Sequence, residues 1–336
     1  MKDKENRIAY IDLAKGFCIA LVVFYHSKGV LGVQYATDIF FVSFRLPLYF
    51  FLSGLFFKEY GSFHNFFIKK TNRLLIPFFF FYLCFSVLLP NILHFLLGMN
   101  FETVIGWPSL WAFIWPGQYP NVAIWFLWCL FLMNILFWMI HHIVIKYARK
   151  YHSVILFLLC FSLGITGYLL IDKSNTDYGN VFKALQNMPF FYFGYFFVNI
   201  GSLQCLQELS KVKVISYLIC CLIVTIILTI FMSWPTICTF YLSGFLGTLF
   251  IIFLAILFQH LPLFSYIGRY SIILLLTHGI LLRFMTPYYH YLSQYIGITN
   301  TTFLMTAILL VSYYLIIPFM CRYFPYVTAQ RPLLRE

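Results

Sequence analysis

Residues 8–31 read IAYIDLAKGFCIALVVFYHSKGVL, an apolar run long enough to cross the hydrocarbon core of a bilayer as one helix. The run nevertheless contains Asp12, Lys15 and His26. Ionisable side chains are costly in hydrocarbon unless they face protein or water, so their presence within a spanning helix indicates a functional site.

Helical geometry places these ionisable residues on one face. A helix advances about 100° per residue, so the step from Lys15 to His26 makes three turns plus roughly 20°, with about 16 Å between the two along the axis. The resulting stripe consists of Asp12, Lys15, Ile19, Val22 and His26. Asp12 lies one helical turn before Lys15, a spacing that allows an ion pair. Alternatively, Asp12 and Lys15 snorkel to one membrane surface and His26 lies at the opposite headgroups.

The composition excludes a soluble globular protein, since 62% of the 336 residues are hydrophobic and 10% are charged. We predict an all-α polytopic membrane protein, a single domain over residues 1–336 with about ten transmembrane helices. The two spans that flank Pro235 are also compatible with a re-entrant unit. No cleavable signal peptide is expected, because the first run is too long and lacks a small-residue cleavage site. The expected spans are approximately 8–31, 38–57, 74–97, 121–143, 153–171, 184–200, 212–233, 236–258, 270–286 and 300–321.

Lysine and arginine orient this array. In the predicted topology most of these cations fall on the side of the N-terminus, and the other side holds Lys28, Lys173, Lys183 and Arg283. Positive loops stay inside, which predicts that both termini are cytoplasmic. The net charge of +12 therefore reflects topology and requires no nucleic-acid partner. The nine cysteines show no spacing suited to zinc, so no metal is expected.

Two further stretches carry buried or clustered cations. Residues 44–57, FRLPLYFFLSGLFF, contain Arg45 at the same membrane side as His26, and a Pro47 that is expected to kink the helix. Deeper in this span, Ser53 and Gly54 permit close approach by a neighbouring helix.

The second stretch, FFIKKTNRLLIP at residues 66–77, places Lys70 and Arg73 three apart at the entry to the third span. Such a basic group either fixes topology and binds anionic lipid, or holds the phosphates of a cytoplasmic cofactor.

Two other features have alternative interpretations. Trp107, Trp111 and Trp115 recur every four residues, as in a helix at the headgroup level or a platform for stacking sugars. His278, within IGRYSIILLLTHGILL at 267–282, either bonds a neighbouring helix or belongs to a polar cavity.

From Ile8 to Arg322 the chain resembles the acyltransferase 3 family of bacterial membrane-bound O-acyltransferases. The resemblance begins with Asp-x-x-Arg/Lys-x10-His in the first span and the Pro-aromatic-aromatic-x-x-Ser-Gly segment in the second. A basic-x-x-Arg pair, a Trp-Phe-Leu start to a middle span and Gly-Arg/Lys-x-Ser…His complete it. The matching residues are Asp12, Lys15 and His26; Pro47 to Gly54; Lys70 and Arg73; Trp125 onward; and Gly268, Arg269, Ser271 and His278.

The chain departs from the family pattern at two positions. Lys15 stands where many members have Arg, and Arg45 stands where sugar-acetylating relatives often carry His. Arg45 therefore suggests a different acceptor or a different way of holding it. The chain is also expected to lack the fused extracytoplasmic esterase-like domain of some relatives.

The resemblance implies an acyl-CoA donor, acetyl-CoA above all, and as acceptor a cell-envelope, capsular or exopolysaccharide sugar or its lipid-linked precursor. It implies a location in the bacterial cytoplasmic membrane. The implied donor-binding residues are Lys15, Lys70, Arg73 and Ser53. The implied catalytic residues are His26, as general base or acyl carrier, with Asp12, Arg45 and His278, of which the last two are candidates for oxyanion stabilisation.

Two alternatives remain open. Another acyl donor such as succinyl-CoA, or a small-molecule acceptor, would keep the family and change the substrate. A transporter with buried charges along its path is the alternative of a different class. No internal repeat joins two halves, and the polar residues concentrate in the first 80 positions, which disfavours the transporter. The sequence indicates neither the acceptor hydroxyl nor the oligomeric state.

Overall fold

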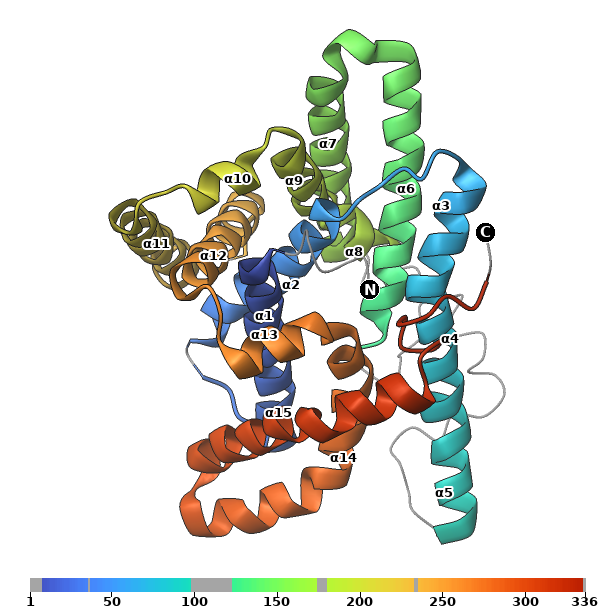
Figure 1. Cartoon of the computed structure of the whole chain (residues 1–336). Coiled ribbons are helices and arrows are strands. Elements are labelled where there is room, and N and C mark those ends of the chain that lie inside the picture. Colours follow the sequence, from blue (N-terminus) through green and yellow to red (C-terminus); the bar gives the residue numbers. More distant parts are fainter. Residues whose placement is uncertain (1–7, 36, 98–122, 174–179, 233–234, 335–336) are drawn as a thin grey trace. The chain divides into compact units, whose positions relative to one another are not determined.

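The computed structural model describes residues 8–35, 37–97, 123–173, 180–232 and 235–334 (Figure 1). These residues form helices and connecting turns, with no β-strand among them. Seven helical stretches in this part of the chain are long and apolar enough to cross a membrane. The predicted all-α architecture is confirmed, and the number of ten spans stays a prediction.

The helices group into two compact units. The first unit consists of Met1–Phe56, Phe193–Leu274 and Leu281–Ile317. Its main helices are α1 (Ala9–Val30), α2 (Asp38–Leu55), α10 (Ser202–Gln207), α11 (Lys211–Ile226) with η6 (Ile227–Phe231), α12 (Ile237–Phe258), α13 (Pro262–Arg269), and most of α9 (Met188–Asn199), α14 (Ser271–Ile296) and α15 (Ile298–Tyr323).

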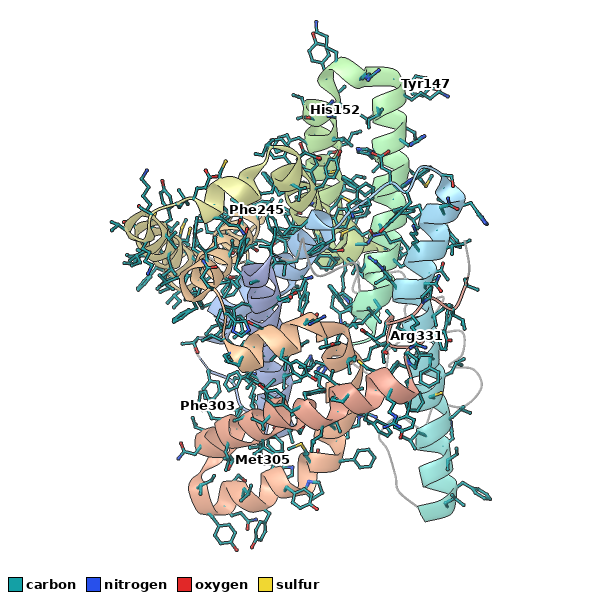
Figure 2. All side chains as sticks on the ribbon, viewed as in Figure 1. Tyr147, His152, Phe245, Phe303, Met305 and Arg331 are labelled. Atoms are coloured by element: carbon teal, nitrogen blue, oxygen red, sulfur yellow. The ribbon has the colours of Figure 1, made fainter. Side chains whose placement is uncertain are left out.

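The second unit consists of Phe57–Tyr192, Leu275–Ile280 and Pro318–Glu336. Within it, α6 and α7 form an antiparallel hairpin, and Tyr147 and His152 lie at its turn (Figure 2). Its helices are α3 (Phe63–Lys70), η1 (Thr71–Leu75), α4 (Ile76–Phe81), η2 (Tyr82–Leu88), α5 (Leu89–Leu97), α6 (Trp125–Ala148), η4 (Arg149–Tyr151), α7 (His152–Lys173) and α8 (Val181–Gln186).

The core of the first unit forms where α1, α2, α11 and α12 meet. Large apolar side chains from these helices are fully buried there, including Leu13, Phe44, Leu48 and Ile252. This core packs α1 against α2, and the two helices carry five of the predicted catalytic and donor-binding residues. Three of them, Asp12, Lys15 and His26, lie on α1, and two, Arg45 and Ser53, lie on α2.

The helix at the third predicted span begins earlier than expected. The third span was expected at 74–97, but helix begins at Phe63, where the Ser62 side chain accepts a hydrogen bond from the Asn65 N–H at 3.2 Å. It continues through two π-helical stretches to Leu97. A capping residue starts this helix before the apolar window does, so Lys70 and Arg73 lie inside helix.

The spans expected at 184–200 and 270–286 also change. The former divides at Asn187 into α8 and α9, because Pro189 lacks an N–H and fits only the first turn of a new helix. The latter continues through Pro287 to Ile296, where Gly297 with φ 79° ends it. Around Pro235 the chain forms two helical stretches, each long enough for its own crossing.

Candidate functional site

The predicted stripe lies on α1, which is one uninterrupted helix through all five of its positions. Ile19 and Val22, its middle members, are buried, whereas Asp12, Lys15 and His26 are partly exposed. The helix is continuous between Lys15 and His26, so the two lie about 16 Å apart along its axis.

Lys15 contacts the end of α2. Its ammonium nitrogen lies 4.0 Å from the centroid of the Phe56 ring, a cation–π distance. One end of the stripe is thereby tied to the last turn of the neighbouring helix.

Two glycines bring α13 against the first turns of α1. A Cβ on Gly16 would overlap the backbone oxygen of Phe264, and one on Gly268 would overlap the backbone oxygen of Asp12. The two backbones are in direct contact, which only glycine permits. Gly268 of the family motif therefore has a structural explanation, since it positions α13 beside Asp12.

At the other end of the stripe, three basic side chains surround the Tyr25 ring. The His26 ring lies edge-on to it with 5.5 Å between centroids. The Arg45 guanidinium carbon is 3.9 Å and the Lys28 ammonium nitrogen 4.8 Å from the Tyr25 centroid. We call Tyr25, His26, Lys28 and Arg45 the Tyr25 cluster. It brings together two predicted residues, His26 and Arg45.

The sequence interpretation missed Lys28 and Tyr25. Lys28 was counted only as a charge on the membrane side opposite the N-terminus, but it is 4% exposed and forms an ion pair with Asp38 at the start of α2. The Asp38 carboxylate also accepts a hydrogen bond from the Tyr35 N–H at 2.9 Å. A lysine and an aspartate on either side of a short turn between two spans were the available signal.

Arg45 differs from Lys28 in its charge balance. It is 8% exposed, and among the described residues no carboxylate forms an ion pair with it. Its backbone oxygen accepts a hydrogen bond from the Cys18 thiol at 3.1 Å, which fixes α2 against α1 at this level. The cluster thus contains a buried cation available to a negatively charged group.

Ser53 is partly exposed on α2, and the helix that approaches α2 closely beside it is α9. A Cβ on Gly194 would overlap the backbone oxygen of Phe51 and lie 2.9 Å from the nitrogen of Leu55. Gly194 therefore allows α9 to approach α2 closely at the level of Ser53 and Gly54.

Lys70 and Arg73 lie in the second unit, at the junction of α3 and η1. Lys70 is 7% exposed, with its ammonium nitrogen 5.4 Å from the centroid of the Phe66 ring. Burial, and secondarily the charge of Arg73, lowers the pKa of Lys70 from 10.5 to about 7. Arg73 is exposed. In the described part of the chain no carboxylate pairs with Lys70.

His278 is 1% exposed in α14, beside the buried Thr277, and belongs to the second unit. That unit contains another buried histidine that the sequence interpretation missed. The Nδ1 atom of His141 lies 3.4 Å from a carboxylate oxygen of Glu59, and its ring stacks on Phe137.

Across the described ranges, no three His, Cys, Asp or Glu side chains gather as metal ligands. The predicted Trp107, Trp111 and Trp115 row lies outside the described residues.

Comparison with protein families matches residues 8–317 to a family model described as an acyltransferase domain. The match spans most of the chain and, with the apolar helices, defines a multi-pass membrane acyltransferase. The chain belongs to the acyltransferase 3 family, as the motifs predicted. Comparisons with curated proteins and with solved structures give no match.

Proposed function

We propose that the protein is an O-acetyltransferase of the bacterial cytoplasmic membrane. It moves acetyl from acetyl-CoA to a hydroxyl of a cell-envelope, capsular or exopolysaccharide sugar, or of its lipid-linked precursor. The excess of Lys and Arg on one side supports an orientation with ten spans and both termini cytoplasmic. The observation that carries the proposal is the Tyr25 cluster, where His26 and the buried Arg45 meet at one ring.

His26 is assigned the proton transfer. As general base, its imidazole takes the proton of the acceptor hydroxyl while the oxygen attacks the thioester carbonyl. A C–O bond forms, the C–S bond breaks, and the CoA thiolate leaves with the proton that the imidazolium returns. Alternatively, the imidazole first takes the acetyl group from the thioester, releasing CoA, and then passes it to the hydroxyl, so that the overall products are the same.

Arg45 is assigned to the oxyanion of the tetrahedral intermediate. Its charge is buried and held against Tyr25, so it requires little reorganisation when negative charge develops. Lys28 is neutralised by Asp38 and is therefore assigned to keeping Tyr25 in place. His278 remains a second candidate for oxyanion stabilisation.

Donor binding is assigned to two groups of residues, each on the observations of its own unit. In the first, Lys15 binds a phosphate of acetyl-CoA, with Asp12 orienting its ammonium group and Ser53 as a further donor contact. The length of the stripe is comparable with an extended pantetheine arm, so a thioester can reach His26 while the nucleotide stays near Lys15. In the second, Lys70 and Arg73 form a basic group suited to phosphate oxygens.

The test is acetyl-CoA turnover by purified protein with total envelope glycan as acceptor. His26→Ala is expected to abolish acetyl incorporation and to leave CoA binding and thermal stability largely intact. His290→Ala, an exposed histidine on α14 in the same unit, is the matched control and should retain full activity. Lys15→Ala should raise the KM for the donor.

The outcomes separate the remaining possibilities. Incorporation from succinyl-CoA in preference to acetyl-CoA would change the donor and keep the reaction class. A folded, monodisperse preparation that consumes no acyl-CoA thioester would refute the proposed function, and transport assays would follow.

A further inference from the structure

The segment that follows α15 folds back onto the helix that carries Lys70 and Arg73. At one end the Phe324 ring packs against Phe80 of α4, with 6.1 Å between centroids. Between its ends the segment is a compact turn, since the N–H groups of Gln330 and Arg331 both donate to the Pro325 oxygen at 2.9 and 3.0 Å.

At the other end, Asn72 binds the backbone on both of its polar atoms. The Leu333 and Leu334 N–H groups donate to the Asn72 side-chain oxygen at 2.9 and 2.8 Å. The Asn72 side-chain nitrogen donates to the Leu334 oxygen at 2.9 Å. Asn72 is 7% exposed, so these bonds satisfy a buried amide and fix the segment at one register.

This attachment places a third cation near the basic group. Asn72 directly precedes Arg73, and Arg331 lies two residues before Leu333, so at most about 7 Å of chain separates it from the attachment point. Figure 2 shows Arg331 beside the helical run of α3, η1 and α4. The Arg331 side chain is exposed, which leaves its guanidinium able to reach a ligand.

The character of the basic group indicates an anionic ligand. Lys70 is buried among aromatic rings, and no carboxylate pairs with it in the described chain. A buried ammonium group without a counter-ion is costly, and a phosphate supplies the missing negative charge.

We propose that the segment 324–334, anchored by Asn72, is part of the acyl-donor site, and that Arg331 binds a phosphate of acyl-CoA together with Lys70 and Arg73. Asn72 is a positioning residue, because it acts on the ligand through the segment. This inference rests on the proposed function for its donor.

The experiment measures the KM for acetyl-CoA and amide hydrogen exchange of the full-length protein. Arg331→Ala is expected to raise the KM about tenfold with kcat nearly unchanged, as removal of uniform ground-state binding does. Arg322→Ala removes an exposed arginine at the end of α15 and is the matched control, with an unchanged KM.

Asn72→Ala tests the anchoring separately. Exchange at Leu333 and Leu334 should become at least about tenfold faster, and the KM should rise as in Arg331→Ala. The double variant should be no worse than either single variant, since both act through one segment. In the wild type, acetyl-CoA should slow exchange at these two amides.

Two results would overturn the inference. An Arg331→Ala KM within about twofold of wild type, in protein that turns over acetyl-CoA normally, would remove Arg331 from the donor site and leave the proposed function standing. Wild-type protein that neither binds nor consumes acetyl-CoA would remove the proposed function and this inference with it.

Discussion

Replacing Lys70 by Met is expected to stabilise the protein without donor at low pH. Burial, then the charge of Arg73, lowers the pKa of Lys70 from 10.5 to about 7, so the folded state binds fewer protons than the unfolded state between these values. The free energy of unfolding therefore rises with pH through this window, and the full cost of burying the charged Lys70 ammonium group is present below about pH 7. Moving the pKa this far corresponds to about 5 kcal/mol. Roughly 3 kcal/mol of that cost disappears between about pH 6 and pH 9.

The assay is thermal unfolding of wild type and Lys70→Met across that pH range. The advantage of Lys70→Met should be largest at the acidic end and shrink as pH rises, because Met carries no proton to lose. Lys69→Met, which removes a lysine from the partly exposed neighbouring position, is the matched control for the loss of one positive charge on this helix. A Lys70→Met advantage that is constant with pH would refute the reasoning.

Donor binding should show the opposite pH dependence. A phosphate interacts with the ammonium form of Lys70, so binding takes up a proton when the free group is neutral. Affinity for acetyl-CoA should fall by up to about tenfold per pH unit above about pH 7, and Lys70→Met should lose this dependence.

Two further predictions concern packing and charge. Gly268→Ala places a methyl group against the Asp12 carbonyl and should destabilise the folded protein by about 1–3 kcal/mol. Gly29→Ala adds a methyl group where there is open space and should not destabilise it. Thermal unfolding of both variants and of wild type measures the difference. Asp38→Asn leaves the buried Lys28 without its counter-ion and should lower the free energy of unfolding by up to about 3–5 kcal/mol. Adding Lys28→Met to this variant should restore most of the loss. A double-mutant cycle in unfolding free energy measures the coupling, and additive effects of the two changes would contradict this role of the ion pair.

The sequence predicted the helices and the α1 stripe because both depend on local periodicity. An apolar run such as Ala9–Val30 forms an α-helix in a membrane, because every backbone polar group must be hydrogen-bonded within the segment. Helical geometry alone then puts Lys15 and His26 on one face. Where local chemistry competes with apolar content, the prediction was less accurate. The Ser62 cap starts a helix well before the apolar window, and the apolar run near 184–200 divides at Asn187.

The candidate site was only partly predictable for a different reason. His26 and Arg45 are visible as charges within spans, but their meeting at Tyr25 depends on how α1 packs against α2. Lys28 reads as a charge at the membrane surface when only its own helix is considered. The carboxylate that allows it to be buried belongs to Asp38, which lies on the next helix beyond the turn. The contact of Asn72 with Leu333 and Leu334 joins positions at opposite ends of the chain, and no local pattern specifies it.

Charge balance separates the buried cations by role. Lys28 has a carboxylate within the protein, so its charge is offset whether or not substrate is present. Arg45 and Lys70 have no such partner among the described residues, and burial makes each costly until a negative group arrives. In the proposed reaction the donor phosphate is negative throughout, whereas the carbonyl oxygen becomes negative only during acyl transfer. Loss of Lys70 should therefore act mainly on KM, and loss of Arg45 mainly on kcat, since only interactions absent from the ground state accelerate the chemical step.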